Sequence, residues 1–308
     1  MKPRPEWAST FNYKAHSPSG ARRTDCKEFF EKVVARPNNL RDPASCNMLG
    51  GIVCEEYAKN IVIADMDAAE AFRHCVSRFQ EHRVQEHQKN DAANHALICD
   101  GVYEVKRSKA EKDAEAPVVS GTFLELTARN TADGLREATQ GANSVTDGRW
   151  ASIMLEDNEL YHTGEIDVEA HGGVVEIKTM WPSVSDTKQG FRIKSLPAKP
   201  DPFHVRQVAL YWHWLRQSSE NVPVRIVYTN CIGYRIFSSE NCSALSQNIL
   251  HEKVQQLALI ARTRENLMKT AGNKEQLFSL VRPNFADWMW ANVPPEYRRA
   301  ANELWGTE

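Results

Sequence analysis

The second half of the chain carries the clearest pattern of short apolar runs separated by polar turns. Three such runs predict consecutive strands, at Ala151–Leu155, Tyr161–Val168 and Val174–Met180. Two further runs, Val224–Thr229 and Tyr234–Phe237, flank Cys231-Ile232-Gly233 and predict a hairpin. The aromatic-rich segment Phe203–Gln217 between these groups predicts a helix. The pattern therefore indicates a sheet interrupted by one helix.

Helical patterns dominate the first half. Met48–Ile63 places five apolar side chains on one helical side, at Leu49, Ile52, Val53, Tyr57 and Ile61. Ser17 is a suitable N-cap and Pro18 a suitable first position for a helix that runs to about Val34. Asp67–His87 predicts a longer, more polar helix. Thr122–Thr131 fits either a strand or the start of a helix.

Towards the end of the chain, Ser243–Thr270 predicts a long helix and Phe285–Trp305 predicts helical pieces broken by prolines. A charge-dense stretch, Lys106–Glu115, and the basic segment Pro182–Pro202 are expected to be loops, the second of them mobile. We expect one domain over residues 1–308. Its parts are an arm (1–16), a mainly helical part (17–150), a catalytic sheet core (151–240) and a helical extension (241–308).

Composition places the chain among ordinary globular proteins. Of its 308 residues, 42% are hydrophobic and 25% are charged, and the net charge is −2. Any affinity for nucleic acid must therefore come from local basic surface. The sequence shows neither an apolar run long enough to span a membrane nor a secretory signal. Its seven cysteines form no CxxC pair, which argues against a zinc ribbon or an iron–sulfur cluster, and their odd number fits reduced, intracellular thiols.

The candidate chemistry lies on the second and third predicted strands. Asp167 comes near the end of one strand, and Glu176 and Lys178 share one face of the next because side chains alternate along a strand. Buried carboxylates are costly unless they hold a cation or pair with one. An acid, an acid and a lysine in a buried sheet therefore indicate an active site. A structural ion pair would explain Glu176 and Lys178 without catalysis.

This arrangement resembles the PD-(D/E)XK nuclease superfamily. Asp167 matches its first acid, and Glu176-Ile177-Lys178 matches (D/E)XK. The RecB-like branch is indicated by GxxD at Gly164–Asp167, by the QxxxY helix at Gln207–Tyr211 and by the Ser-Pro-Ser segment at Ser17–Ser19. The resemblance implies an α/β fold with a restriction-endonuclease-like core, in which helices flank a mixed central sheet of about four to six strands. We expect helical additions at both ends.

The resemblance also implies a metal cofactor. Asp167 and Glu176 would hold one or two Mg²⁺ or Mn²⁺ ions, because such ions prefer carboxylate oxygens. Lys178 would orient water or stabilise charge on the phosphate. Glu55 stands where the branch carries a histidine, and a carboxylate there can also bind metal. Its neighbour Glu56 is an equal candidate, and both could instead be solvated.

Gln207 and Tyr211 lie four apart on one helical face, where the branch places its glutamine close to the carboxylates and the nucleic-acid backbone. Packing is the simpler role for Tyr211. Phosphate contacts are expected from a set of polar and basic residues comprising Ser17, Ser19, Arg22 and Arg149. An N-cap and exposed charges explain the first three equally well. The cluster cysteines of iron–sulfur members are missing around Cys26.

The resemblance implies a Mg²⁺-dependent hydrolase, a DNA exonuclease acting on ends or single strands in recombination, repair or phage replication. Two alternatives remain: an RNA 5′-end decapping or exoribonuclease-like enzyme of the same superfamily, and a nuclease-fold module that binds DNA without cutting it. Expected partners are DNA, a single-strand annealing or binding protein and further copies of the chain, with no membrane. Polarity, exo- or endonucleolytic mode and oligomeric state stay open.

Overall fold

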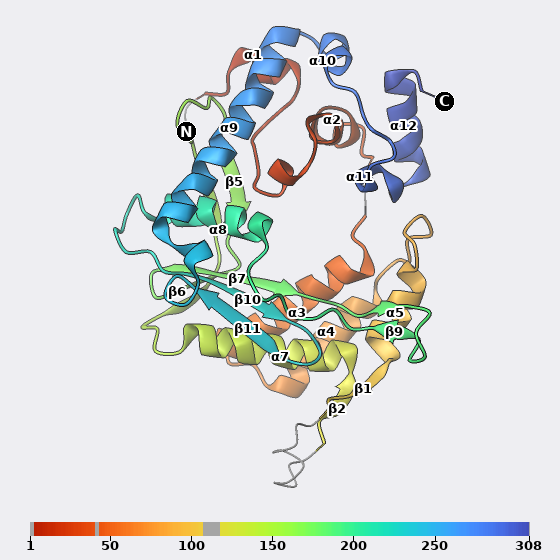
Figure 1. The fold of residues 1–308 in the computed structure, drawn as a ribbon, viewed down its shortest axis with the longest axis vertical. Helices are drawn as coiled ribbons and strands as arrows, with labels where there is room; N and C mark the ends of the chain where they lie inside the picture. The colour runs from red at the N-terminus through yellow and green to blue at the C-terminus, as the bar shows by residue number, and fades with distance from the viewer. Residues whose placement is uncertain (1–2, 41–42, 107–117, 308) are drawn as a thin grey trace.

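A five-stranded mixed sheet forms the centre of the fold in the computed structural model, which describes residues 3–40, 43–106 and 118–307 (Figure 1). Its strand order is β11-β10-β7-β6-β3, and only β7 and β10 are parallel to each other. The strands are β3 (Val145–Asp147), β6 (Val168–Ala170), β7 (Gly173–Thr179), β10 (Val224–Thr229) and β11 (Tyr234–Ser238). The predicted α/β fold with a mixed central sheet is confirmed.

Helices cover both faces of this sheet (Figure 1). One face packs on α3 and α7, and the other on α8 and, through it, on α9. Val175 and Ile177 belong to the core beneath α3 and α7, whereas Val174 belongs to the core beneath α8. Because side chains alternate along a strand, Glu176 is placed on the α8 side with Val174. The helices of these two layers are α3 (Cys46–Val62), α4 (Ala68–Gln80), α5 (Asp91–Asp100), α7 (Phe123–Thr139), α8 (Pro202–Leu215) and α9 (Gln247–Ala271).

Side-chain caps fix where several of these helices begin. The hydroxyl of Ser45 accepts from the Met48 amide before α3, and that of Thr122 accepts from the Glu125 amide before α7. The carboxylate of Asp67 accepts from two amides at the start of α4. Each cap satisfies an amide that the helix itself leaves unpaired. Thr122 thus starts a helix, which settles the ambiguous segment of the sequence.

Three two-stranded ribbons surround the sheet. They are β1 (Val102–Glu104) with β2 (Ser120–Thr122), β4 (Trp150–Ile153) with β5 (His162–Glu165), and β8 (Ser183–Val184) with β9 (Phe191–Arg192). The single strand predicted over Tyr161–Val168 is wrong, because the chain bends at Ile166–Asp167 and divides it into β5 and β6. Residues 107–115 of the charge-dense loop predicted at Lys106–Glu115 lie outside the described residues.

The two ends of the chain fold together above the sheet (Figure 1). Phe30 contacts Trp290 and Tyr297, with ring centroids 5.6 and 4.8 Å apart. The predicted arm packs into the same core through Phe11 and Tyr13, which are fully buried. The elements of this terminal core are α1 (Glu6–Thr10), α2 (Asp25–Phe29), a π-helix (Phe30–Ala35), α9, α10 (Lys274–Leu280), α11 (Trp288–Ala291) and α12 (Pro295–Trp305).

The helix predicted from Ser17 begins later than expected. The Ser17 hydroxyl accepts from the Gly20 amide at 3.1 Å and caps only a short 3₁₀ turn, Gly20–Arg22. Arg264 of α9 donates to the carbonyls of Gly20 and Arg23, at 3.2 and 2.8 Å. This tertiary contact holds the chain extended at Arg23, so that α2 starts at Asp25. Within the described ranges, every helix is too short or too polar to cross a membrane.

Candidate active site

The bend between β5 and β6 brings Asp167 against the central strand. Its Oδ2 accepts from the Ile177 amide of β7 at 2.8 Å. The bend is held by the neighbouring loop, since the Gly148 amide donates to the Asp167 carbonyl at 3.1 Å. Gly148 has to lack a side chain, because a Cβ there would lie 1.5 Å from the Ile166 carbonyl oxygen. The strand break therefore positions the first acid of the site.

Glu176 and Lys178 form a buried ion pair beside Asp167. The Lys178 ammonium donates to Oε1 of Glu176, whereas Oε2 is buried without a hydrogen-bond partner in the structure. Burial, followed by the negative charge of Asp167, raises the pKa of Glu176 to about 8. Burial alone would lower the pKa of Lys178, but the carboxylates of Glu176 and Asp167 outweigh it and raise that pKa. The lysine is thus a fixed cation.

Glu55 of α3 is the third carboxylate of this group. Burial and the charge of Asp167 raise its pKa. Lys59, one turn later, bridges Glu55 at 2.7 Å and Asp147 of β3 at 2.8 Å. Glu56 points elsewhere and pairs with Arg78, beside a separate cavity of about 480 Å³ between α3 and α4. Of the two adjacent glutamates, Glu55 is therefore the one placed at the site.

These three carboxylates have the chemistry that a hard divalent cation requires. The negative charge of Asp167 contributes to the raised pKa of both Glu55 and Glu176. The unpartnered Oε2 of Glu176 is an available oxygen ligand. In the described part of the chain, no three acidic, histidine or cysteine side chains are already gathered around one point. The residues fit a metal in chemistry, while Lys178 supplies the neutralising charge in this structure.

Gln207 and Tyr211 of α8 lie over the same acids. The Gln207 amide donates to the Tyr211 hydroxyl at 3.3 Å. Burial, followed by the charge of Glu176, raises the pKa of Tyr211, so the phenol keeps its proton beside the carboxylate. Gly164 of β5 makes room for the ring, since a Cβ there would lie 2.8 Å from the Tyr211 ring and hydroxyl. Packing of the Tyr211 ring thus explains why a glycine occupies the first position of the GxxD motif.

A cleft of about 1130 Å³ leads to the site. Lys178 and Glu55 both line it, while Glu176 is fully buried and reaches the cleft through its pairing with Lys178. The residues that line the cleft come from α3, the end of β7, the β8–β9 segment and the start of α8, and include Met48, Ile52, Glu55, Lys178, Thr179, Arg192, Lys194 and His204.

The sequence interpretation did not assign His204 and Tyr228 to the site, although both line the cleft. His204 Nδ1 lies 2.7 Å from the Tyr228 hydroxyl. Burial, followed by the charge of Lys178, lowers the pKa of His204 to about 4, so this imidazole is neutral at pH 7. Tyr228 is the parallel neighbour of Lys178 in the sheet. Alignment of β10 with β7 in the correct register would have placed Tyr228 beside Lys178. A single sequence does not show the register of two parallel strands.

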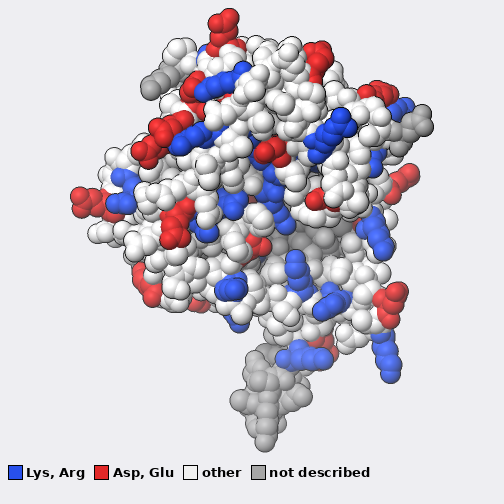
Figure 2. All heavy atoms as spheres, turned by 45° about the horizontal axis from the view of Figure 1, so that its top comes forward, with Lys and Arg blue, Asp and Glu red and all other residues white. Residues whose placement is uncertain are grey.

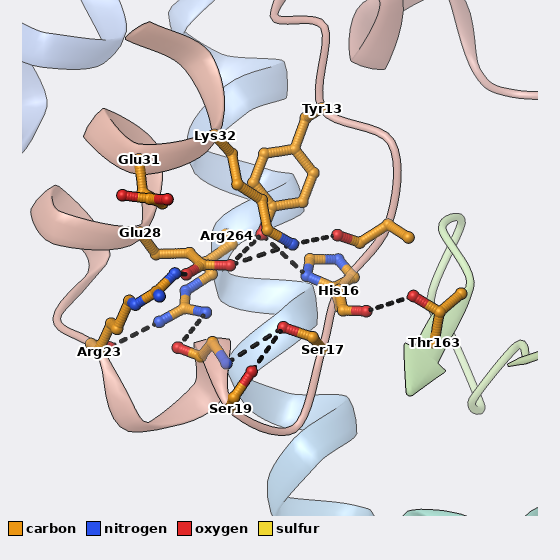
Figure 3. A network of polar contacts seen from close by, with 12 residues as sticks. Tyr13, His16, Ser17, Ser19, Arg23, Glu28, Glu31, Lys32, Thr163 and Arg264 are labelled. Carbon is orange, nitrogen blue, oxygen red and sulfur yellow. Dashed lines mark hydrogen bonds and ion pairs between the residues drawn. The ribbon is translucent and has the colours of Figure 1, made fainter. Parts of the chain in front are cut away.

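Ser17 and Ser19 lie in a network of polar contacts (Figure 3). Their hydroxyls are 3.4 Å apart, and Ser17 is occupied with the Gly20 amide. Figure 3 shows Arg23 and Lys32 directed toward the buried carboxylate of Glu28, at 3.0 and 3.1 Å. The two serines therefore stabilise the turn that presents Arg22, and Arg22 itself lines the cleft.

Arg149 is placed apart from the cleft. Its guanidinium makes two hydrogen bonds to Glu169, at 2.6 and 3.1 Å, and lies 4.8 Å from the ring centroid of Trp214. The structure thus does not bring Arg149 together with Arg22, and its sequence-predicted contact with phosphate stays a prediction.

The basic segment 182–202, predicted to be a loop, carries a short ribbon and is hydrogen-bonded to the rest of the fold. Asn230 donates to the Lys194 carbonyl at 2.9 Å, and Arg235 donates to the Pro197 carbonyl at 2.7 Å. The segment forms the β8–β9 ribbon and directs Arg192 and Lys194 to the cleft. Figure 2 shows Lys and Arg side chains gathered around the hollow that crosses the middle of this face. Local basic surface is thus present despite the near-neutral net charge.

Comparisons with known proteins add little to this geometry. No family model matches the sequence, and no curated protein matches it. Among solved structures, the chain is similar to a crystal structure of a protein from Eubacterium rectale that is provisionally described as an exonuclease. The TM-score is 0.42 and the identity 16%, over 86% of this chain and 88% of that one.

Proposed function

We propose that this protein is a metal-dependent nuclease of the PD-(D/E)XK superfamily and its RecB-like branch. One observation carries the proposal. Glu176 is fully buried in the middle of a sheet, paired with Lys178 and next to Asp167, at the end of a basic cleft. A buried acid with a free oxygen and a raised pKa has a high cost in a purely structural ion pair. Such a cost is typical of functional sites.

Asp167, Glu176 and Glu55 are the residues that would hold Mg²⁺ or Mn²⁺, as one or two ions. When bound, such an ion activates water and offsets the negative charge of the scissile phosphate. Lys178 adds a permanent positive charge at the same place, which stabilises the charge that develops on the phosphate oxygens. Its ammonium is already oriented by Glu176, so little reorganisation is needed when substrate arrives.

Gln207 and Tyr211 position the acids rather than react. The buried Tyr211 hydroxyl excludes water from the α8 side of Glu176, and Gln207 fixes the orientation of that hydroxyl. The neutral imidazole of His204 stands beside Lys178 and can donate a hydrogen bond to a phosphate oxygen, or exchange one with water. Arg22, Arg192 and Lys194 bring the negatively charged backbone into the cleft.

DNA is the proposed substrate, cut at ends or in single strands during recombination, repair or phage replication. The proposed setting is the cytoplasm of a bacterium or an infected host cell. A single-strand annealing or binding protein and further copies of the chain are the proposed partners. The RNA 5′-end enzyme and the non-cutting module are the alternatives that the experiment has to separate.

The test is a time course on 5′- and 3′-labelled linear DNA, circular DNA and capped RNA, with Mg²⁺ or with EDTA. We expect mononucleotides from one end of linear DNA, intact circles and no product in EDTA. Lys178→Ala should lower the cleavage rate by about 10²–10³-fold, as loss of one charge-stabilising donor does. Lys253→Ala, at a half-buried lysine on α9, is the control and should cut normally. Absence of Mg²⁺-dependent cleavage on every substrate would show that the enzyme proposal is wrong.

A further inference from the structure

Arg22 lines the cleft, and two aromatic rings flank its guanidinium outside the carboxylate–lysine site. The Arg22 guanidinium carbon lies 4.9 Å from the ring centroid of Phe203 and 5.2 Å from that of Trp288. The three residues come from the 3₁₀ turn, from α8 and from α11, which are remote in the sequence. We name this cluster the aromatic platform.

The platform leaves much of its apolar surface in water. Trp288 is 61% exposed and Phe203 is 38% exposed. Trp290, on the same short helix, is 2% exposed and packs against Phe30 and Tyr297 in the terminal core. Helix α11 thus anchors itself with one tryptophan and presents the other to solvent beside a cation. Single exposed apolar residues need no explanation, but a tryptophan stacked near an arginine that lines the cleft forms a defined surface.

The α3 side of the cleft also exposes apolar side chains. Met48 and Ile52 of α3 are 62% and 39% exposed, and both line the cleft. Arg192 and Lys194 add positive charge between the two walls. A single strand of nucleic acid offers flat apolar bases on a negatively charged backbone, which matches aromatic faces interspersed with cations. A duplex hides its base faces within the stack.

We propose that the Arg22–Phe203–Trp288 platform binds the unpaired bases of a single strand on its way to Lys178. Trp288 offers its solvent-exposed surface to one base, and Arg22 holds an adjacent phosphate while its guanidinium stays against the two rings. The platform makes the protein prefer single-stranded or frayed ends over blunt duplex ends. This inference rests on the proposed function only in taking nucleic acid as the ligand of the cleft.

Binding without cleavage tests the platform. A labelled oligothymidylate and a blunt-ended DNA hairpin are titrated in EDTA with the wild type, Trp288→Leu, Trp288→Phe and Leu280→Ala. Leu280 is exposed on α10 of the same terminal unit and serves as the control. We expect Trp288→Leu to weaken oligothymidylate binding by about 5- to 150-fold, the range for loss of one stacked base. Trp288→Phe should retain most of the affinity, and Leu280→Ala all of it.

A second readout does not depend on the leucine variant being folded. Oligothymidylate should quench part of the wild-type tryptophan fluorescence, and that part should be missing in Trp288→Phe. Unchanged quenching, oligothymidylate affinity within about twofold of wild type for Trp288→Leu, or equal losses on oligothymidylate and hairpin would each overturn the platform. A failure of the proposed function would be recognised by a different result. A protein that binds oligothymidylate through Trp288 but cuts nothing with Mg²⁺ keeps the platform and loses the nuclease assignment.

Discussion

Replacement of Glu28 by glutamine tests whether buried charge stabilises the segment that presents Arg22 to the cleft. Glu28 is fully buried on α2, where Lys32 and Arg23 contact its two oxygens (Figure 3). Burial alone would raise its pKa, but Lys32, Arg23 and Arg264 outweigh burial and lower it from 4.5 to about 2. At 1.36 kcal/mol per pKa unit, this corresponds to about 3 kcal/mol of folding free energy at pH 7.

The pKa of Lys32 is also lowered, because burial of its ammonium outweighs the attraction of Glu28. The pair as a whole therefore stabilises the protein by less than Glu28 alone suggests. The value of about 3 kcal/mol is the cost of removing one member while the cations stay buried, and breaking a buried pair typically costs about 3–5 kcal/mol. We expect Glu28→Gln to lower the unfolding free energy by this amount at pH 7.

The pH dependence follows from the direction of the shift. The folded protein holds Glu28 at a lower pKa than the unfolded chain does, so the stabilisation is complete above about pH 4.5 and is lost as the pH falls toward 2. By pH 4, about 0.8 kcal/mol, or roughly a quarter, should already be gone. The difference between the wild type and Glu28→Gln should therefore shrink between pH 7 and pH 4.

Urea unfolding followed by tryptophan fluorescence and circular dichroism measures both quantities. Glu252→Gln, at an exposed position on α9, is the matched control and should change stability by less than about 0.5 kcal/mol. A loss below about 1 kcal/mol in Glu28→Gln at pH 7 would refute the reasoning, since a buried cation pair left uncompensated costs more. So would a difference from wild type that stays constant with pH.

Three further predictions follow from the site and its supports. Gly164→Ala should cost about 1–3 kcal/mol of stability and reduce cleavage, because the new methyl group collides with Tyr211; Gly233→Ala, where no atom lies within 4 Å, is the control, and equal losses in both would contradict the packing explanation. Burial lowers the pKa of His16 and of His162, so the unfolding free energy should decline as the pH falls below about 6.5. In urea titrations, His162→Gln should make this pH dependence shallower by up to about 1.4 kcal/mol per pH unit, and an unchanged slope would exclude a contribution from His162. Lys59→Met should free Glu55 and Asp147 from their shared cation and remove a positive charge that opposes Mg²⁺, so the Mg²⁺ concentration required for half-maximal cleavage should fall, whereas an unaltered requirement in a Mg²⁺ titration of the cleavage rate would show that Glu55 takes no part in metal binding.

The sheet and its acids could be predicted because their pattern is local. The alternation through Glu176-Ile177-Lys178 fixes which side chains share a face, and β7 lies almost where the sequence predicts it. Helix α3 was equally accessible, since its apolar spacing is long and regular. Cores of this kind are specified by short-range periodicity, and tertiary contacts only confirm it.

The parts that failed depend on partners far along the chain. The sequence near Ser17 does not indicate that Arg264 binds the carbonyls of Gly20 and Arg23, a contact that makes the helix begin only at Asp25. The bend at Asp167 likewise depends on the loop at Gly148. Tyr228 was overlooked because its place beside Lys178 follows from parallel register. The choice between Glu55 and Glu56 required the rotation of α3, which the Lys59–Asp147 and Glu56–Arg78 contacts reveal.

The union of the two chain ends has a consequence for synthesis on the ribosome. Arg22 stands on a turn whose carbonyls are held by Arg264, and its guanidinium rests against Trp288. A nascent chain that already displays the acids of β7 therefore still lacks one wall of its cleft until residues near 290 have emerged. Loop closure across such a separation is slow relative to local helix formation. The order of translation thus delays a competent cleft until Arg264 and Trp288 have both emerged.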